Sequence, residues 1–206
     1  MNRKAFNRIN YGLFLVGSVL EGKYQGCVVN SLHQITSSNP AKFSLSLNKS
    51  NETYKAVEAA GSFAATVLER GTPKELVDLF GYKSGRVVDK YEGFQVETDE
   101  AGNPYVKDHA LARISCKIVD KLDLGSYVLF VCEATEAEVL GEGPAMTLDD
   151  YRGEGGATPA AATVVRIVEE VAWRCTICGY IAERETLPDD YRCPICRAPK
   201  DKFEKM

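Results

Sequence analysis

The fold of the C-terminal part is decided by two short stretches, Trp173-Arg-Cys175-Thr-Ile-Cys178-Gly179-Tyr180 and Tyr191-Arg-Cys193-Pro-Ile-Cys196. Each stretch holds a Cys-x-x-Cys pair, and an aromatic residue stands two positions before its first cysteine. Four thiolates at this spacing predict a tetrahedral sulfur cage for iron or zinc. The segment 173–206 is too short to fold on apolar burial alone. We therefore expect metal binding to supply most of its folding free energy.

The residues around the four cysteines favour iron over zinc. Gly179 follows the first pair directly, and Pro194 lies inside the second. Glycine permits a positive φ, which lets backbone N–H groups turn toward the ligand sulfurs. Such hydrogen bonds tune a redox metal and matter less to a structural one. A zinc ribbon without redox chemistry remains the alternative.

The complete C-terminal pattern resembles rubredoxin. Besides the two cysteine pairs, it includes Pro188-Asp-Asp-Tyr191, Lys200 and Phe203. The resemblance implies one iron that cycles between Fe(II) and Fe(III) on Cys175, Cys178, Cys193 and Cys196. The stretch between the two pairs is shorter than in free-standing rubredoxins and is similar to compact rubredoxin modules fused to larger redox proteins.

Composition limits the remaining possibilities. The chain has 206 residues, 45% of them apolar, and a formal net charge of −4. It shows no basic stripe, so we expect no nucleic-acid partner. It contains no apolar run long enough to cross a membrane, and its first residues lack the apolar part of a secretion signal. Cys27, Cys116 and Cys132 occur singly in apolar runs, which predicts buried free thiols in a cytoplasmic protein.

A stretch rich in glycine and alanine, Arg152 to Thr163, separates two parts of the chain. It offers little surface for packing and is typical of a linker. The apolar run Val164 to Val168 then predicts a first strand of the metal module. We expect an N-terminal domain at 1–151, a linker or crossing segment at 152–168 and the rubredoxin-like domain at 169–206.

The N-terminal part is predicted to be mainly β, with two short helices, and its many strands suggest a closed barrel. In 110–119 apolar residues alternate with polar ones, which predicts one buried and one exposed face. The apolar run 127–132 predicts a strand buried on both faces. The strands are expected at 11–19, 25–32, 42–47, 110–119 and 127–132.

Two helices are expected to interrupt the strands. The first runs from an Asn or Ser cap near Asn51 to Ala60 and stops at Gly61. The second begins with Thr72-Pro-Lys-Glu75, which has the pattern of a capping box with proline at the first helical position, and ends at Gly81.

Two polar clusters are candidates for holding a cofactor. Asn30-Ser31-Leu-His-Gln34 follows an apolar strand, and its amides and hydroxyl suit the polar edge of a flavin ring. Taken alone, however, the segment is better explained as a strand end before a turn. The stretch from Ser46 to Thr53 leads from a strand into a helix, whose N-terminal end and Lys49 suit a phosphate. Ordinary helix capping is the alternative there.

Taken in order, the N-terminal segments resemble the flavin reductase-like, split-barrel FMN-binding family over roughly residues 1–150. The resemblance implies a split β-barrel with FMN at the interface of a homodimer. Asn30, Ser31 and Gln34 would lie near the isoalloxazine ring, and Asn48, Lys49, Asn51 and Thr53 near the phosphate. Lys90 matches a lysine that approaches the flavin, although alone it would be interpreted as a solvated surface charge. The segments are Tyr11–Val16, Gly22–Ser31, Asn39–Pro40, Asn48–Thr53, Ser62–Phe63, Ser84–Lys90 and Tyr127–Val131.

Two departures from the family pattern concern the nicotinamide donor. Tyr127 replaces a common histidine, and the segment Met146–Tyr151 keeps a single aromatic ring. The absence of a Rossmann glycine motif does not exclude NAD(P)H, because the family does not use one. His33 and His109 are expected to be structural or surface residues.

The two parts together resemble the high-molecular-weight rubredoxins of anaerobic bacteria. This implies electron transfer from NAD(P)H through FMN to the iron and on to an acceptor such as a flavodiiron oxygen or nitric oxide reductase. Two alternatives remain: an electron carrier that a partner reductase reduces, and an FMN protein with a zinc-ribbon docking module. FAD in place of FMN also stays open.

Overall fold

The structure is a computed structural model, and it describes residues 3–153, 173–182 and 186–205. The N-terminal part is mainly β, as predicted from the sequence. Its elements are η1 (Arg3–Arg8), β1 (Phe14–Leu20), β2 (Lys23–Val29), β3 (His33–Gln34), β4 (Lys42–Asn48), α1 (Glu52–Ala60), β5 (Ser62–Leu68), α2 (Lys74–Tyr82), β6 (Val96–Thr98), β7 (Pro104–Val106), β8 (Ala110–Asp123), β9 (Tyr127–Val139) and α3 (Leu148–Gly153).

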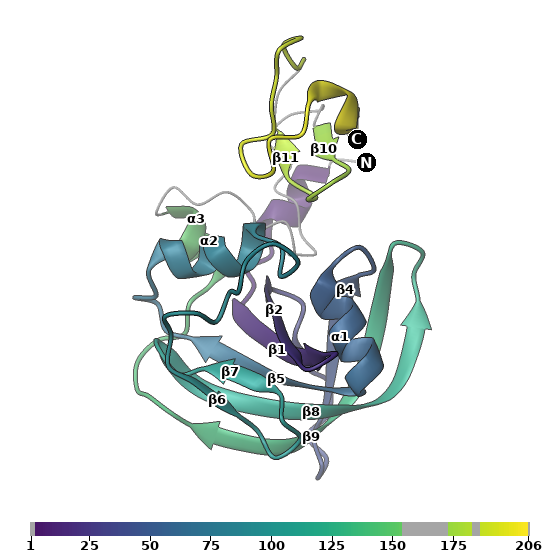
Figure 1. Cartoon of the computed structure of the whole chain (residues 1–206). Helices are drawn as coiled ribbons and strands as arrows, with labels where there is room; N and C mark the ends of the chain where they lie inside the picture. Colours follow the sequence, from purple (N-terminus) through teal and green to yellow (C-terminus); the bar gives the residue numbers. More distant parts are fainter. Residues whose placement is uncertain (1–2, 154–172, 183–185, 206) are drawn as a thin grey trace.

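One antiparallel sheet dominates this part, with the strand order β2-β1-β5-β8-β9-β4-β3. The sheet curls around its own core, as Figure 1 shows. Within the described residues its end strands, β2 and β3, do not pair with each other, so the barrel is split there rather than closed. Asn30, Ser31 and Leu32 connect these two strands and therefore lie at the opening.

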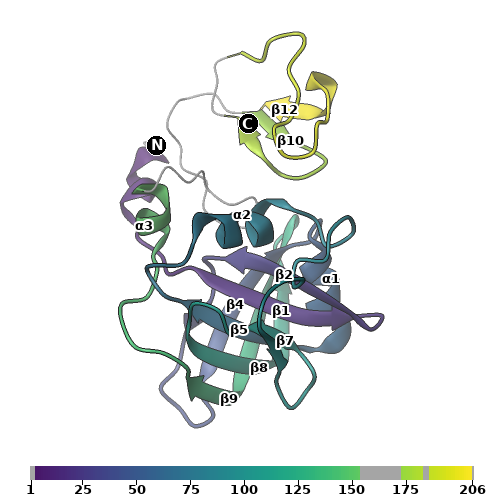
Figure 2. The same ribbon diagram turned by 60° about the vertical axis from the view of Figure 1, so that its left-hand side comes forward.

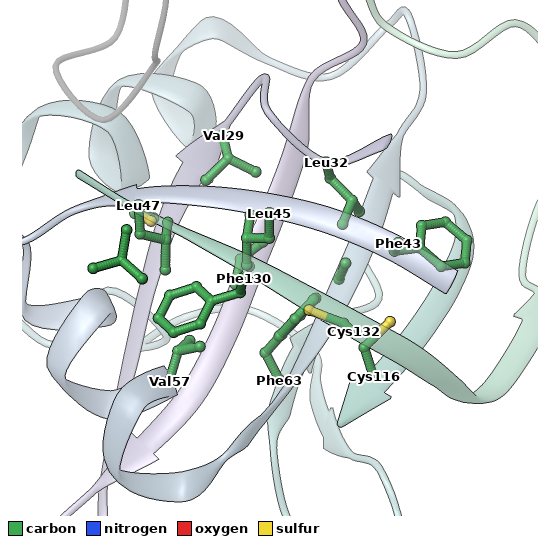
Figure 3. Packing of buried hydrophobic residues seen from close by; sticks show 14 residues of the cluster. Val29, Leu32, Phe43, Leu45, Leu47, Val57, Phe63, Cys116, Phe130 and Cys132 are labelled. Carbon is green, nitrogen blue, oxygen red and sulfur yellow. The ribbon is translucent and has the colours of Figure 1, made fainter. Parts of the chain in front are cut away.

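The inside of the curled sheet is filled by one apolar cluster (Figure 3). Alternate residues of β1 point to opposite sides: Val16 belongs to this inner cluster, whereas Leu15 packs in a second cluster with Val77 and Phe80 of α2. Figure 2 shows α2 lying across the sheet at β2. Both faces of β1 are therefore buried, which accounts for its continuous apolar sequence.

The two long strands differ from their predicted patterns. In β9, buried residues alternate with half-exposed ones from Tyr127 to Cys132, so the prediction of burial on both faces was wrong. In β8, Arg113 and Ser115 on the predicted exposed face are buried. The guanidinium of Arg113 pairs with Glu136 at 2.5 Å and lies over the Tyr105 ring, so its charge is compensated where it is covered.

The ends of α1 agree with the prediction, whereas those of α2 do not. The Asn51 side chain accepts a hydrogen bond from the Thr53 N–H at 3.0 Å, and Gly61 ends α1 with φ of 67°. For α2 the cap position is Pro73, without a side-chain cap, and the Thr72 hydroxyl donates to the Glu69 carbonyl instead. Gly81 lies inside α2, which continues to Tyr82, so the predicted capping box and glycine stop were wrong.

A third helix, α3, was not expected. It includes Arg152 and Gly153, which the sequence had suggested as the start of the linker. Its N-terminal end is capped by Thr147, whose hydroxyl oxygen accepts the Asp150 N–H at 3.1 Å, while the Asp150 carboxylate accepts the Thr147 N–H at 3.0 Å. The rest of the predicted linker and the predicted strand at Val164–Val168 lie outside the described residues.

The C-terminal part contains β10 (Trp173–Cys175), β11 (Ile181–Ala182), η2 (Lys200–Lys202) and β12 (Phe203–Lys205). The strand order is β11-β10-β12, and all pairs are antiparallel. Its small apolar cluster contains two of the cysteines, Cys175 and Cys193, together with Leu187 and Phe203. So small a cluster depends on the cysteine site for its stability.

The three cysteines outside the C-terminal part are buried and unpaired, as predicted. Burial raises the pKa of the Cys116 and Cys132 thiols to about 12 and also raises the pKa of Cys27. These thiols are therefore protonated and unreactive at neutral pH. Among the described residues, the structure shows no helix that is long and apolar enough to cross a membrane.

Candidate metal centre and flavin site

The four cysteines predicted as metal ligands converge in the structure. All their sulfur atoms lie within 4.8 Å of one another. The Cys175 and Cys196 sulfurs are 3.6 Å apart, and those of Cys178 and Cys193 are 3.5 Å apart. A tetrahedral ion with metal–sulfur bonds of about 2.3 Å requires sulfur separations of about 3.8 Å. The cage therefore fits iron or zinc in the number and kind of its donors, and the two closest sulfur pairs would separate slightly around the ion.

Two matching turns aim backbone N–H groups at the sulfurs. Gly179 follows the first cysteine pair with φ of 77°, and the N–H of the next residue, Tyr180, bonds the Cys178 sulfur. Arg197 follows the second pair with φ of 62°, and the N–H of Ala198 bonds the Cys196 sulfur. Gly179 thus adopts the positive φ that was expected to turn N–H groups toward the sulfurs. Arg197 adopts a similar positive φ, although a residue with a side chain rarely does so.

The residues predicted near a flavin ring lie at the opening of the barrel, but they differ in exposure. Asn30 and Ser31 are buried, and the Ser31 hydroxyl donates to the Ser46 carbonyl at 2.8 Å. Gln34 is exposed, and its amide donates to the carbonyl of Thr36 in its own turn. Asn30 and Ser31 are therefore already positioned, whereas Gln34 has to leave its turn to contact a ligand.

The residues predicted near a phosphate gather where β4 leads into α1. Asn48 is buried, and its side-chain oxygen accepts bonds from the Ser50 N–H at 2.9 Å and hydroxyl at 2.8 Å. Asn51 caps α1, and Thr53 is buried in its first turn. Lys49 pairs with the exposed Asp123 at 2.7 Å. The segment thus presents the N-terminal end of a helix together with one lysine.

Lys90 is buried rather than solvated, so its interpretation as a surface charge was wrong. Its ammonium donates to the carbonyls of Gly26 at 2.8 Å and Phe80 at 3.1 Å. Burial lowers the pKa of Lys90 to about 8, and the nearby Cys27 raises this pKa by a smaller amount. The Cys27 thiol in turn bonds the side chains of Thr53 and Asn51. Lys90 therefore lies between β2 and α2, close to Cys27.

The departures from the family pattern fall at two different places. Tyr127 stands opposite Asn48 in the register of β9 and β4, next to the predicted phosphate site. Tyr151, the single ring of the segment 146–151, is buried and bonds Asp78, so it belongs to the core. Of the two histidines, His109 pairs with Glu69 at 2.5 Å and His33 packs edge-on against Tyr11, which is consistent with structural roles.

Sequence reasoning missed two residues beside these sites. Cys27 lies beneath the cap of α1, and Arg174 lines a pocket together with Lys49. Both stand in stretches that the sequence analysis singled out, Gly22–Ser31 and the first cysteine stretch, but their positions depend on contacts between segments far apart in the chain. The sequence indicated only that Cys27 is buried, because it stands in an apolar run.

Comparison with known proteins agrees with this geometry. The profile of the flavin reductase like domain matches residues 6–157. The chain belongs to the flavin reductase-like family. The profile of the rubrerythrin, rubredoxin-like domain matches residues 173–204, which include all four cysteines of the cage. A flavin reductase-like domain joined to a rubredoxin-like domain indicates an oxidoreductase of flavin-mediated electron transfer.

Individual relatives cover both parts of this flavin reductase-like protein. It is 34% identical to the high molecular weight rubredoxin of Moorella thermoacetica over 100% of both chains, which confirms the resemblance of the two-part sequence. It is 39% identical to a ferric-chelate reductase (NAD(P)H) of Archaeoglobus fulgidus, over 80% of this chain and 97% of the reductase. The crystal structure of flavoredoxin from Methanosarcina acetivorans matches with a TM-score of 0.58 and 26% identity, over 63% of this chain and 69% of that one.

The residues of the flavin reductase-like domain fit a phosphorylated flavin. Buried amides of Asn30 and Asn48 supply polar groups beside the opening of the barrel. The N-terminal end of α1, together with Lys49 and Lys90, supplies positive charge for a phosphate. The four-thiolate cage fits an iron ion by its donor set.

Proposed function

We propose that this protein transfers electrons from NAD(P)H through FMN to one iron ion on Cys175, Cys178, Cys193 and Cys196. The observation that carries the proposal is the presence of a four-sulfur cage and a flavin reductase-like domain in one chain. A bound flavin accepts a hydride and releases electrons singly, whereas such an iron carries one electron at a time. The similarity to the NAD(P)H-dependent ferric-chelate reductase supports the donor.

The protein's own residues bind and orient these groups. Asn30 and Ser31 hold the polar edge of the ring, with Gln34 as a further contact. Asn48, Lys49, Asn51 and Thr53 hold the phosphate at the N-terminal end of α1, and Lys90 adds charge. The N–H groups that bond the cysteine sulfurs stabilise the more negative, reduced cage and so raise its potential.

The division of the chain follows from the same proposal. We infer a flavin domain at 1–151, a connection at 152–168 and an iron domain at 169–206. The acceptor is a protein that takes single electrons, for which a flavodiiron-type reductase has suitable chemistry. The protein acts as a homodimer, supported by exposed apolar side chains at one end of β8 and β9, namely Val119, Leu122 and Leu124.

The proposal is tested by adding NADH to the purified protein without oxygen and following both absorption spectra. Flavin absorption should fall first, and the ferric absorption should follow. In Cys193→Ser, which lacks one cage ligand, FMN should still bind and bleach, but a one-electron acceptor protein should no longer be reduced. Cys132→Ala removes a thiol outside the cage and serves as the matched control.

Two results would contradict the proposal in different ways. Acceptor reduction at the normal rate by Cys193→Ser would show that electrons bypass the iron. A flavin that NADH and NADPH both leave oxidised would favour a carrier that a partner reductase reduces. The position of Tyr127 beside Asn48 is where such a loss of nicotinamide use would originate.

A further inference from the structure

A pocket of about 300 Å³ lies between the two parts of the protein. Asn48, Lys49 and Ser126 line it from the flavin reductase-like domain, and Arg174 and Gly179 line it from the rubredoxin-like domain. This volume is at the lower end of those of small-molecule sites. The pocket therefore combines residues of the predicted phosphate site with residues of the first cysteine turn.

The residues that line the pocket include several with side-chain hydrogen-bond donors, among them Arg174, Lys49 and Ser126. Arg174 is half-buried, and within the described part of the chain its guanidinium forms no ion pair and donates no hydrogen bond. Two carboxylates near the pocket would repel a bound anion. Asp123 pairs with Lys49, and Glu204 stands across from Arg174 in the register of β10 and β12. Both are exposed, so water and salt screen their charges.

We propose that this pocket binds the phosphate group of FMN, with Arg174 as a phosphate ligand that the rubredoxin-like domain contributes. A guanidinium donates two parallel hydrogen bonds to a phosphate, which suits a half-buried arginine without another partner. The inference rests on the proposed function, because it assumes that FMN is the flavin. Its consequence is that FMN binding holds the cage against the flavin domain, since Cys175 lines the same pocket.

The test compares FMN with riboflavin, which has the same ring system but no phosphate. Dissociation constants are measured by fluorescence titration on the full-length, iron-loaded protein and its variants. Arg174→Gln should bind FMN at least about tenfold more weakly, corresponding to about 1.4 kcal/mol, and riboflavin unchanged. Arg192→Gln removes the same charge from the rubredoxin-like domain outside the pocket and should leave both constants unchanged.

The ferric absorption of each variant reports whether its cage is intact. Arg174→Lys keeps a charge but loses the paired hydrogen bonds, and should bind FMN with intermediate affinity. Unchanged FMN affinity in Arg174→Gln would overturn the inference, and so would an equal loss for FMN and riboflavin. Failure of the unaltered protein to bind either flavin would instead refute the proposed function.

Discussion

At the scale of single residues, the Lys90 ammonium is held inside the flavin domain by the carbonyls of Gly26 and Phe80. Burial lowers its pKa to about 8, from a usual value near 10.5. Cys27, whose thiol bonds the Asn51 and Thr53 side chains, lies close to this ammonium. A phosphate bound at the N-terminal end of α1 favours the charged lysine and so raises this pKa again.

The affinity for FMN is therefore expected to depend on pH. Below pH 8, Lys90 is protonated in both the free and the bound protein, and the affinity stays constant. As the pH rises through 8, the free protein loses this proton while the bound protein keeps it, so FMN binds more weakly. Titrations from pH 6.5 to about 9.5 measure this, and Lys90→Met should remove the dependence. Riboflavin is the control, and an equal pH dependence for riboflavin would contradict a phosphate effect.

The two turns of the cage provide a matched pair of substitutions. Gly179 and Arg197 occupy equivalent positions with positive φ, where a side chain costs about 1–2 kcal/mol. Gly179→Ala should therefore destabilise the iron domain. Arg197→Gly should leave the stability of this domain unchanged or raise it, because glycine relieves the strain of the folded turn but increases the entropy of the unfolded chain. The midpoint of guanidinium-induced loss of the ferric absorption measures both. A loss of stability in Arg197→Gly as large as that in Gly179→Ala would contradict the prediction.

At the scale of elements, the N-terminal cap of helix α1 stabilises the helix and also lies at the proposed phosphate site. The Asn51 side chain accepts the Thr53 N–H and its carbonyl accepts the Tyr54 N–H, so that among the hydrogen bonds of the described residues the Glu52 N–H of the first turn is left for a phosphate. α2 has no side-chain cap and packs Val77 and Phe80 against the outer face of the sheet. We therefore expect α1 to contribute to the proposed phosphate site, whereas α2 covers the outer face of the sheet.

Substitutions of Asn51 should separate these two effects. Asn51→Ala removes the cap and should lower the free energy of unfolding by about 1 kcal/mol, together with the affinity for FMN. Asn51→Asp keeps the cap and suits the helix dipole, so the stability should be retained. Its negative charge should still repel the phosphate and weaken FMN binding. Denaturant unfolding and FMN titration measure the two quantities, and tight FMN binding by Asn51→Asp would argue against a phosphate beside α1.

The elements also show which parts of the fold local sequence could predict. The cap at Asn51, the stop at Gly61 and the cysteine turns depend on neighbours in the chain, and their predictions were confirmed. The end of α2 was mispredicted because packing against the sheet carries the helix past Gly81. The burial of Lys90 and Arg113 depends on distant segments that cover them, which neither alternation nor charge could indicate.

At the scale of the whole molecule, the long strands β8 and β9 extend beyond the core and leave apolar side chains uncovered. Leu122 is 57% exposed, and Leu124 and Val119 lie close by in sequence with similar exposure. Removing such a group from water by pairing with a second copy is favourable. This end of β8 also carries Asp123, the partner of Lys49, so a second copy there would lie beside the predicted phosphate site.

Leu122→Asp is accordingly expected to convert the dimer into a monomer and to weaken FMN binding. A carboxylate buried in an apolar interface without a partner is costly, and the flavin would lose the contacts that a second copy supplies. Light scattering at several concentrations measures the mass. Val139→Asp, at an 80% exposed position at the far end of β9, is the matched control and should remain dimeric. Equal masses for the two variants would refute the assigned surface.

In the proposed function, one chain joins a flavin to an iron ion held by four cysteines. The decisive test is the metal and flavin content of the purified protein, determined by elemental analysis together with extraction of the flavin. We expect one iron and one FMN per chain, with the iron lost in Cys193→Ser and the FMN lost on dilution of Asn51→Asp. A protein that holds zinc in the cage and no flavin would refute electron transfer from a flavin to an iron in this chain.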